Sequence, residues 1–301
     1  MTINTYHIPV MLKEAVDGLA IKASGVYVDA TFGGGGHSRE ILKHLNKDGR
    51  LFVFDQDIDA QKNTIDDPRL TFIASNFAFA SNFLKLYGVT KVDGVLADLG
   101  VSSHQFDFGA RGFSIRFDAP LDMRMDQASD LTAHSVVNSY SAEDLTQLFY
   151  SYAELSNAPQ WTEAIISRRA KAEINTTFEL IDAVAHLTPE SKKSKLLAQL
   201  FQGIRVEVNQ ELASLETFLL QLNDLIQTNG RLVVISYHSL EDRLVKRFIR
   251  SGHIDGQIRK DFYGNPDLYF KRIGKMLKPN SSELEQNNRA RSAKMRIAEK
   301  L

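Results

Sequence analysis

The sequence predicts an α/β protein in which a mostly parallel, doubly wound sheet is interrupted by a helical insertion. Short apolar segments that suit strands alternate with amphipathic segments that suit helices, at the spacing of βαβ units. The pattern lapses after residue 104 and resumes at about residue 200. A glycine run and two aspartates follow predicted strands, and ligands of such sheets bind beyond the carboxyl ends of the strands. We therefore expect a ligand crevice there.

The composition is that of an ordinary globular protein. The chain has 301 residues, of which 43% are hydrophobic, enough for one large domain or two modest ones. It has no cysteine, which excludes disulfides and thiolate metal ligands. The net charge of −1 does not indicate a partner. We see neither a signal pattern nor an apolar run of roughly 18 residues, so we expect a cytoplasmic protein without membrane contact.

The first hundred residues contain a short amphipathic helix and four predicted strands. The helix spans 11–20, where apolar residues share one side. The strands are short, mainly apolar segments at 26–30, 51–54, 70–74 and 94–97. Their alternation with predicted helices, at βαβ spacing, predicts a parallel sheet that is covered on both faces.

The middle of the chain has a different pattern. Residues 105–130 are rich in Arg, Asp, Gly and Phe without a steady period, and Pro120 argues against a helix. Residues 141–199 have helical spacing with polar breaks, which indicates a helical insertion.

The α/β pattern then resumes with a long amphipathic helix over 204–226, a fifth strand over 231–236 and a helix over 240–249. We therefore predict a sheet domain in two parts, with a loop and helical substrate-recognition domain between them, at 1–106, 107–199 and 200–301.

The glycine run lies between the first strand and a helix. Glycines let the backbone approach a ligand closely, and the helix that follows offers free N–H groups. Gly36-His37-Ser38 lacks the lysine of a phosphate-binding P-loop, and Ser38 stands where a dinucleotide motif needs glycine. An acid just before the run, Asp29, is similar to the first motif of class I methyltransferases. The alternative is a plain tight turn.

Two further aspartates end predicted strands. Asp55 lies roughly 20 residues past the glycines, where a carboxylate can accept hydrogen bonds from ribose hydroxyls. Both NAD and S-adenosylmethionine carry ribose hydroxyls, so Asp55 does not distinguish between them. The alternative role, a helix N-cap, suits Asp57 better than Asp55. Asp98 ends an apolar strand and could accept a hydrogen bond from an amino group, or serve only in a turn.

Three other segments carry candidate residues. His238 stands between serines after the fifth strand, but the hydrolase nucleophile elbow is absent, and Ser239 suits a helix cap. The mixture of Arg and Phe over 111–126 suits contact with bases and phosphates, or a loop held by ion pairs. The basic residues of 271–300 form either a solvated tail or a phosphate-facing surface. The histidines are scattered, so we predict no metal.

Several long motifs resemble the RsmH (MraW) family of 16S rRNA (cytosine-N4)-methyltransferases, over residues 7 to 296. They are HIPVMLKEA (7–15), DATFGGGGHS (29–38), DLGVSS (98–103), RGFS (111–114), PLDMRMD (120–126), FQGIRVEVN (201–209), HSLEDR (238–243) and NRARSAKMR (288–296). Two features depart from the family: Tyr237 replaces its usual phenylalanine, and residues 152–159 match poorly.

The resemblance implies a class I fold dependent on S-adenosylmethionine: a Rossmann-like, mostly parallel seven-stranded sheet with an inserted helical domain. It implies methylation at N4 of a cytosine near the decoding centre of the small ribosomal subunit. The implied cofactor contacts are Gly35, Gly36, His37, Asp55, Phe77, Asp98 and Gln105. For catalysis we favour Asp98, as acceptor of the N4–H bonds, over His238 and the 118–122 loop. For substrate binding we select Arg111, Arg116, Asp122 and Arg124.

Two other functions are considered. An NAD-dependent oxidoreductase would share the fold, but Ser38 and the lack of a hydride-relay motif argue against it. A non-enzymatic ribosome assembly factor would keep the fold as an RNA clamp, but the three strand-end aspartates argue against that. A homodimer is compatible with the sequence.

Overall fold

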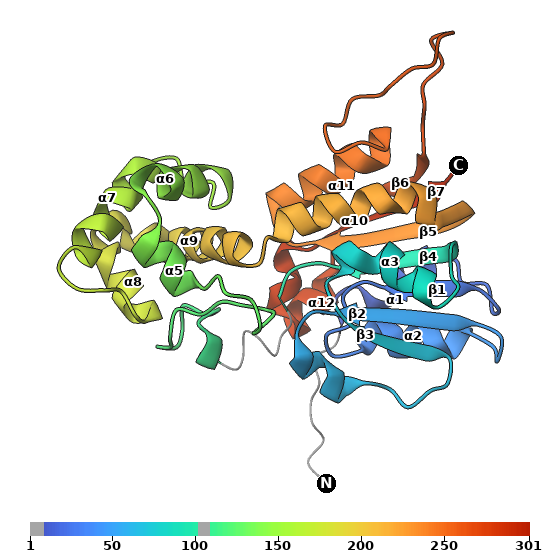
Figure 1. The fold of residues 1–301 in the computed structure, drawn as a ribbon, viewed down its shortest axis with the longest axis horizontal. Helices are drawn as coiled ribbons and strands as arrows, with labels where there is room; N and C mark the ends of the chain where they lie inside the picture. Colours follow the sequence, from blue (N-terminus) through green and yellow to red (C-terminus); the bar gives the residue numbers. More distant parts are fainter. Residues whose placement is uncertain (1–8, 102–108) are drawn as a thin grey trace. The chain divides into compact units, whose positions relative to one another are not determined.

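The computed structural model describes residues 9–101 and 109–301 (Figure 1). The chain divides into two compact units. Unit 1 comprises Met1–Gly100 and Leu212–Leu301, and unit 2 comprises Val101–Glu211. The predicted insertion, 107–199, therefore falls short of the compact unit at both of its ends.

Unit 1 is built on a seven-stranded sheet with the order β3-β2-β1-β4-β5-β7-β6. The strands are β1 (Val26–Asp29), β2 (Arg50–Asp55), β3 (Leu70–Ala74), β4 (Val92–Asp98), β5 (Ile226–Ser236), β6 (Phe270–Leu277) and β7 (Lys294–Lys300). The first five strands pair in parallel, and β7 runs antiparallel between β5 and β6. The predicted mostly parallel α/β sheet is confirmed.

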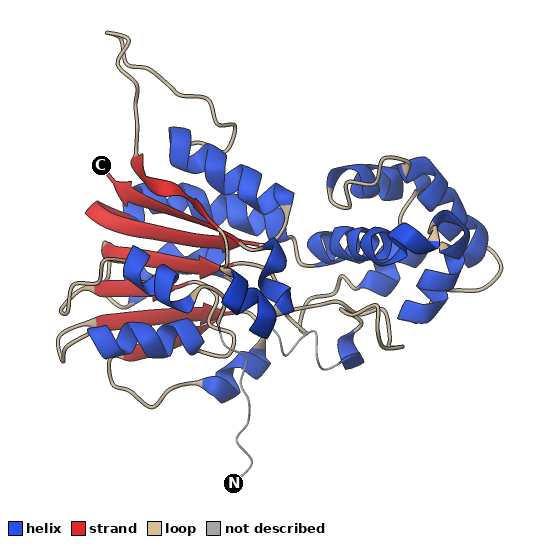
Figure 2. Cartoon of the chain, turned by 180° about the vertical axis from the view of Figure 1, so that it is seen from behind, coloured by secondary structure: helices blue, strands red, loops and turns tan. Residues whose placement is uncertain are grey.

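Helices cover both faces of this sheet (Figure 2). They are α1 (Leu12–Gly18), α2 (Gly36–His44), α3 (Ala80–Leu86), α10 (Glu211–Leu225), α11 (Ser239–Ser251) and α12 (Ser281–Gln286). Alternate residues of a strand point to opposite faces, so Phe52 packs in the core with α3, α10 and α11, whereas Leu51 and Val53 pack in the core with α1 and α2. The sheet is thus buried on both sides, as the alternation of strands and helices predicts.

The long helix predicted over 204–226 is wrong. The segment contains the end of α9 (Lys193–Val208), then α10, and Ile226 already belongs to β5. Gln210 has a φ of 49°, and the Asn209 side chain bonds to the Met123 carbonyl at 2.8 Å instead of continuing a helix. The apolar period crosses the break because α9 and α10 each bury a face, although in different cores.

The basic C-terminal segment is not a tail. It forms β6, α12 and β7, which complete the sheet. Within β7, Met295 and Ala298 are fully buried while the residues beside them are partly exposed. Met295 packs in the core with α1 and α2, and Ala298 packs in the core on the opposite face, with α10 and α11. The charged residues of β7 concealed the strand in the sequence.

Unit 2 is helical and has a core of its own. It contains α5 (Ala133–Ser139), α6 (Ala142–Ser151), α7 (Ala158–Arg169), α8 (Thr177–Ala183) and α9. The core includes Phe149, Trp161 and Leu200. The helical character predicted for 141–199 is confirmed, whereas α5 was not anticipated, because the prediction placed the first helix at Ser141.

Candidate functional site

The carboxyl ends of four parallel strands meet at one edge of the sheet in unit 1. Asp29, Asp55, Asp98 and Ser236 are the last residues of β1, β2, β4 and β5, which are consecutive neighbours in the parallel part of the sheet. The aspartates selected from the sequence therefore lie along one edge. The glycine loop and the start of α2 follow β1 at this edge.

The glycine loop has a backbone that side chains would disturb. Gly35 precedes α2 with a φ of 72°, and a Cβ there would lie 2.8 Å from the Phe32 ring. A Cβ on Gly36 would lie 2.0 Å from Cγ of Pro9. No side chain caps the first turn of α2, so its N–H groups and the positive end of its dipole suit an anionic ligand.

Asp29 holds the turn between β1 and α2. Its carboxylate accepts a hydrogen bond from the Ser38 hydroxyl at 2.6 Å and one from the Thr31 N–H at 3.2 Å. Only 1% of the residue is exposed, and burial raises the pKa of the carboxyl to about 6. Asp29 therefore stabilises the turn between β1 and α2.

Asp55 joins the glycine loop to the end of β2. Its two carboxylate oxygens accept from the N–H groups of Gly33, at 2.8 Å, and Asp57, at 2.9 Å. Burial raises its pKa to about 6. Each oxygen has a second lone pair, so hydroxyl donors can still bind. Asp57 caps the following 3₁₀ helix by accepting from the Asp59 N–H, as the sequence predicts.

Asp98 has polar neighbours from two other segments of unit 1. Its Oδ1 accepts a hydrogen bond from the Tyr237 hydroxyl at 2.8 Å, and its Oδ2 lies 3.9 Å from Nδ1 of His37. The side chain keeps 21% of its exposure. Burial raises the pKa of Asp98 to about 7, although the hydrogen bond from Tyr237 acts to lower it. The carboxyl is poised to exchange a proton near neutral pH.

His37 is a neutral imidazole. Burial lowers its pKa to about 4, and its Nε2 lies 3.1 Å from the Val10 carbonyl. A neutral ring that bonds to a carbonyl carries its hydrogen on that nitrogen, so Nδ1 presents a lone pair towards Asp98. The 3.9 Å separation is too long for a direct hydrogen bond.

His238 begins α11. Its Nδ1 accepts from the Glu241 N–H at 3.5 Å, and the Glu241 carboxylate accepts in turn from the N–H groups of Tyr237 and His238. This reciprocal arrangement is a capping box. The prediction that Ser239 caps the helix is wrong by one residue. Nε2 of His238 lies 3.2 Å from Glu241.

Phe77 and Gln105 are the remaining cofactor candidates. Phe77 follows β3 in a short 3₁₀ helix and packs on Phe218 with ring centroids 5.0 Å apart. It remains partly exposed, so an aromatic base could stack on it. Gln105 lies outside the described residues.

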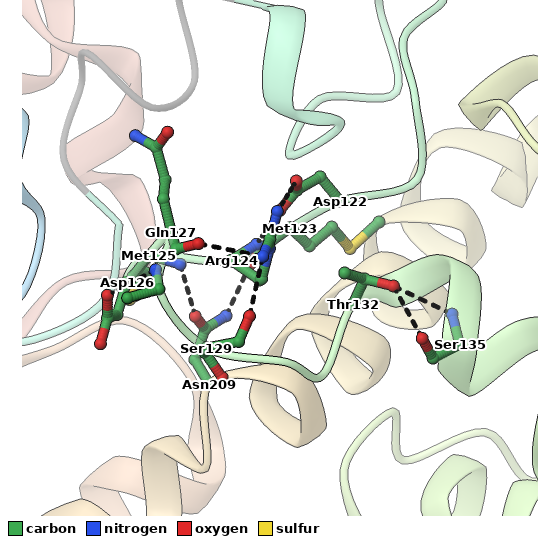
Figure 3. Close-up of polar contacts among 11 residues, drawn as sticks. Asp122, Met123, Arg124, Met125, Asp126, Gln127, Ser129, Thr132, Ser135 and Asn209 are labelled. Carbon is green, nitrogen blue, oxygen red and sulfur yellow. Dashed lines mark hydrogen bonds and ion pairs between the residues drawn. The ribbon is translucent and has the colours of Figure 1, made fainter.

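The four substrate-binding candidates lie in unit 2, and two of them bind each other. The Arg124 guanidinium donates to both carboxylate oxygens of Asp122, at 2.9 and 2.8 Å, and to the carbonyls of Gln127 and Ser129 (Figure 3). Partial burial acts to raise the pKa of Asp122, but the hydrogen bonds from Arg124 outweigh it and lower the pKa. These contacts favour the alternative of an ordered loop held by ion pairs.

Arg111 and Arg116 differ from that pair. The Arg111 guanidinium lies over the Phe113 ring, 5.5 Å from its centroid. Arg116 is exposed beside the half-exposed Phe117. Arg116 therefore suits contact with phosphate better than Arg124 does.

Comparison with known proteins identifies the family. The model of the MraW methylase family matches residues 4–301. The chain belongs to this family. Ribosomal RNA small subunit methyltransferase H of Christiangramia forsetii is 54% identical over 301 residues, which is all of both chains. The proteins of that name from Flavobacterium psychrophilum and Bacteroides thetaiotaomicron are 56% and 48% identical, covering 96% and 98% of this chain and 100% and 98% of the relatives.

Membership in the MraW methylase family confirms the family resemblance found in the sequence. Among the described residues, no helix combines the length and the apolar character that a membrane crossing requires.

The sequence reasoning missed two residues that fix Asp98. The Thr31 hydroxyl accepts a hydrogen bond from the Asp98 N–H at 2.7 Å, and Tyr237 donates to the carboxylate. Thr31 lies inside the DATFGGGGHS motif of the MraW methylase family, so its place next to Asp29 was the available signal. Tyr237 was noticed only as a departure from the family's usual phenylalanine.

Proposed function

We propose that this chain transfers a methyl group from S-adenosylmethionine to N4 of a cytosine in the decoding region of 16S rRNA within the small ribosomal subunit. The observation that carries the proposal is the family match over residues 4–301, together with relatives about half identical over their full length that are named for methylation of small-subunit rRNA. The target base is stacked inside folded RNA, so it has to flip out of its stack to reach the carboxyl edge of the sheet.

The edge of the sheet in unit 1 fits S-adenosylmethionine. The uncapped start of α2 suits its carboxylate, Asp55 suits the ribose hydroxyls, and the partly exposed Phe77 suits the adenine. When bound, this cofactor supplies an electrophilic methyl group on a sulfonium. We also retain Gly35, Gly36, His37, Asp98 and Gln105 as proposed cofactor contacts.

The N4 amine of cytosine is a weak nucleophile because its lone pair is conjugated with the ring. We assign its activation to Asp98, whose free Oδ2 can accept a hydrogen bond from N4–H while Tyr237 holds Oδ1. As the N–C bond forms and the C–S bond breaks, one N4 proton becomes acidic, and it passes to the carboxylate and then to water. Charge on nitrogen is thereby neutralised during transfer. His238, which begins α11, is the weaker candidate for this role.

The function is tested by methyl transfer from labelled S-adenosylmethionine to small ribosomal subunits from a strain that lacks the gene for this chain. Nucleoside mass analysis is expected to find the label in N4-methylcytidine. Label in another nucleoside, or none in subunits and free RNA, would contradict the proposal.

The role of Asp98 is tested by Asp98→Ala, which is expected to abolish transfer. The control is Asp48→Ala, which removes an exposed carboxylate elsewhere in unit 1. Near-normal turnover of Asp98→Ala would refute the assignment.

The setting of the protein follows from this substrate. Small subunits are assembled in the cytoplasm of bacteria, so we propose a cytoplasmic location. The absence of a metal and the homodimer stay predictions, which metal analysis and sedimentation of the purified protein would test.

A further inference from the structure

A hairpin arm projects from unit 1 between α11 and β6 (Figures 1 and 2). We define the hairpin arm as residues 252–269. Its two sides are joined by a bridge between Lys260 and Pro266 and by a hydrogen bond from the Asp267 N–H to the Arg259 carbonyl at 2.9 Å. The arm adds nothing to the sheet, whose edge strand β6 begins after it.

The tip of the hairpin arm is ordered by Asp261. One carboxylate oxygen accepts from the N–H groups of Tyr263 and Asn265, both at 2.9 Å, and the other accepts from the Asn265 side chain at 2.9 Å. A tip with this many internal bonds holds its shape without a partner.

This ordered tip carries two aromatic side chains that do not pack into any core. Phe262 is 96% exposed and Tyr263 is 85% exposed, and their rings stand nearly perpendicular with centroids 5.6 Å apart. Ile258 and Leu268, at 44% and 39%, extend the apolar surface along the arm. Single exposed apolar residues are common, but a group of them on a projecting, ordered hairpin indicates a contact surface.

The arm carries charges of both signs: three carboxylates, which take part in local contacts, and two cations. Asp255 accepts a hydrogen bond from the Gln257 N–H at 2.8 Å. Asp261 is held within the turn, and Asp267 lies beside the Tyr269 hydroxyl, whose pKa it raises. Arg259 and Lys260 are exposed, and within the described part of the chain their side chains make no hydrogen bond or ion pair. Lysines on the neighbouring edge strand, β6, protect an open sheet edge from pairing with other chains. That protection does not account for the exposed aromatic residues of the arm.

We propose that the hairpin arm is a second RNA contact, in which Phe262 and Tyr263 stack on unpaired bases while Arg259 and Lys260 bind the adjacent phosphates. Aromatic faces beside cations are the chemistry that recognises single-stranded nucleic acid, since every base offers a face for stacking and every linkage a negative charge.

The arm contacts RNA away from the methylated base. Phe270, at the start of β6, pairs with Lys300, whose neighbour Glu299 pairs with Arg231 early in β5. The arm therefore leaves the sheet at the end opposite to Asp98 and Ser236. Strands of about six residues separate the two ends by roughly 20 Å. The arm thus holds the substrate without touching the reacting atoms.

This proposal rests on the proposed function, because it takes the substrate to be RNA. It is tested in the full chain by replacing both aromatics, as Phe262→Ala/Tyr263→Ala. Two quantities are measured separately: the Kd for small ribosomal subunits that lack the methyl group, and kcat at saturating subunits. We expect the Kd to rise at least about fivefold, from the loss of base stacking, with kcat and the affinity for S-adenosylmethionine unchanged.

Two controls separate stacking from a general loss of surface. Phe262→Trp/Tyr263→Trp retains aromatic faces and is expected to keep the wild-type Kd. Leu86→Ala removes an apolar side chain that is 79% exposed on α3 and is expected to have no effect. Replacing Arg259 and Lys260 by glutamine should make the dependence of log Kd on log salt less steep.

An unchanged Kd in the alanine variant overturns the proposal. A Kd that changes only together with the sedimentation coefficient of the free protein also overturns it, because the arm would then be an interface between proteins. Because Kd is measured without turnover, a wild-type chain that binds subunits but transfers no methyl group would refute the proposed function and still decide the role of the arm.

Discussion

Burial and hydrogen bonding shift the pKa of the Asp98 carboxyl in opposite directions. Burial raises its pKa to about 7, and the Tyr237 hydroxyl, 2.8 Å from Oδ1, acts to lower it. Tyr237 also occupies one oxygen, while the other lies 3.9 Å from Nδ1 of His37. A proton acceptor of this kind is most effective when its pKa lies near the working pH.

Replacing Tyr237 by phenylalanine is expected to change the pH dependence of methyl transfer. Without the hydroxyl the pKa of Asp98 rises, so less of it is ionised at neutral pH. The acidic limb of the kcat profile should move to higher pH by on the order of one unit, while KM for S-adenosylmethionine changes little. Tyr150→Phe, at a half-exposed position on α6, is the control. A profile that overlays the wild type would remove Tyr237 from this role.

The same carboxyl affects the stability of the protein without its ligands. An unfolded aspartate has a pKa of about 3.9, whereas Asp98 in the fold has one of about 7. Between these values the unfolded chain releases its proton and the folded chain retains it, so this group makes folding less favourable as the pH rises through the interval. The effect is absent below pH 4 and complete above pH 7.

Asp98→Asn should therefore become more stable relative to the wild type as the pH rises from 4 to 8. We expect a difference on the order of 2 kcal/mol at pH 8, less than full burial would give because water reaches the side chain. Thermal melting at several pH values measures it. A difference in Tm that is the same at pH 4 and pH 8 would contradict the raised pKa.

At the scale of elements, α11 is fixed at its first turn and tied to β7. The capping box of His238 and Glu241 satisfies the first N–H groups, and Asp242 binds Arg296 at 2.7 Å and Lys294 at 3.3 Å. These contacts join two of the family motifs, HSLEDR and NRARSAKMR. They also explain why the basic segment at 294–296 is not free for phosphate.

Asp242→Asn is expected to destabilise unit 1 by about 1–3 kcal/mol, because it leaves the poorly exposed Arg296 without its carboxylate. Urea unfolding measures the change, with Asp48→Asn as an exposed control. Equal midpoints for the two variants would show that the pair contributes nothing.

Elements with a simple apolar pattern were predictable from the sequence, and elements whose pattern depends on distant partners were not. β3 was predicted at 70–74 and spans Leu70–Ala74, because its residues are mainly apolar. β7 was missed because ion pairs with α11 allow lysine and arginine inside the sheet. The break before α10 depends on Asn209, whose partners Met123 and Met125 are remote in the sequence (Figure 3).

At the scale of the whole molecule, the two units have separate hydrophobic cores. The sequence predicted an insertion but placed its end at 199, because the apolar period runs on without interruption into the helix that follows. The strand-end aspartates were predictable, since the topology of a parallel sheet gathers its carboxyl ends. The hydrogen bonds of the Thr31 and Tyr237 hydroxyls to Asp98 were not predicted, because both residues lie far from Asp98 in the sequence.

Separate cores imply that damage to unit 2 leaves the cofactor site intact. Phe149→Ala removes a fully buried ring from the core of unit 2 and should cost about 3–5 kcal/mol there. Methyl transfer to small subunits should fall, while the affinity for S-adenosylmethionine, measured by calorimetry, stays within about twofold.

The control is Phe178→Ala, which removes a ring that is 42% exposed on α8. Loss of cofactor affinity in Phe149→Ala in parallel with loss of unit 2 structure would show that the units fold as one.

The order of strands in the sheet sets a sequence of events during synthesis. β6 leaves the ribosome before β7, yet in the sheet β6 pairs only with β7, which in turn pairs with β5. A nascent chain can therefore assemble the five parallel strands before β6 has a strand to pair with. The last two strands have to join together, and until they do the outer edge of β5 is open to other chains.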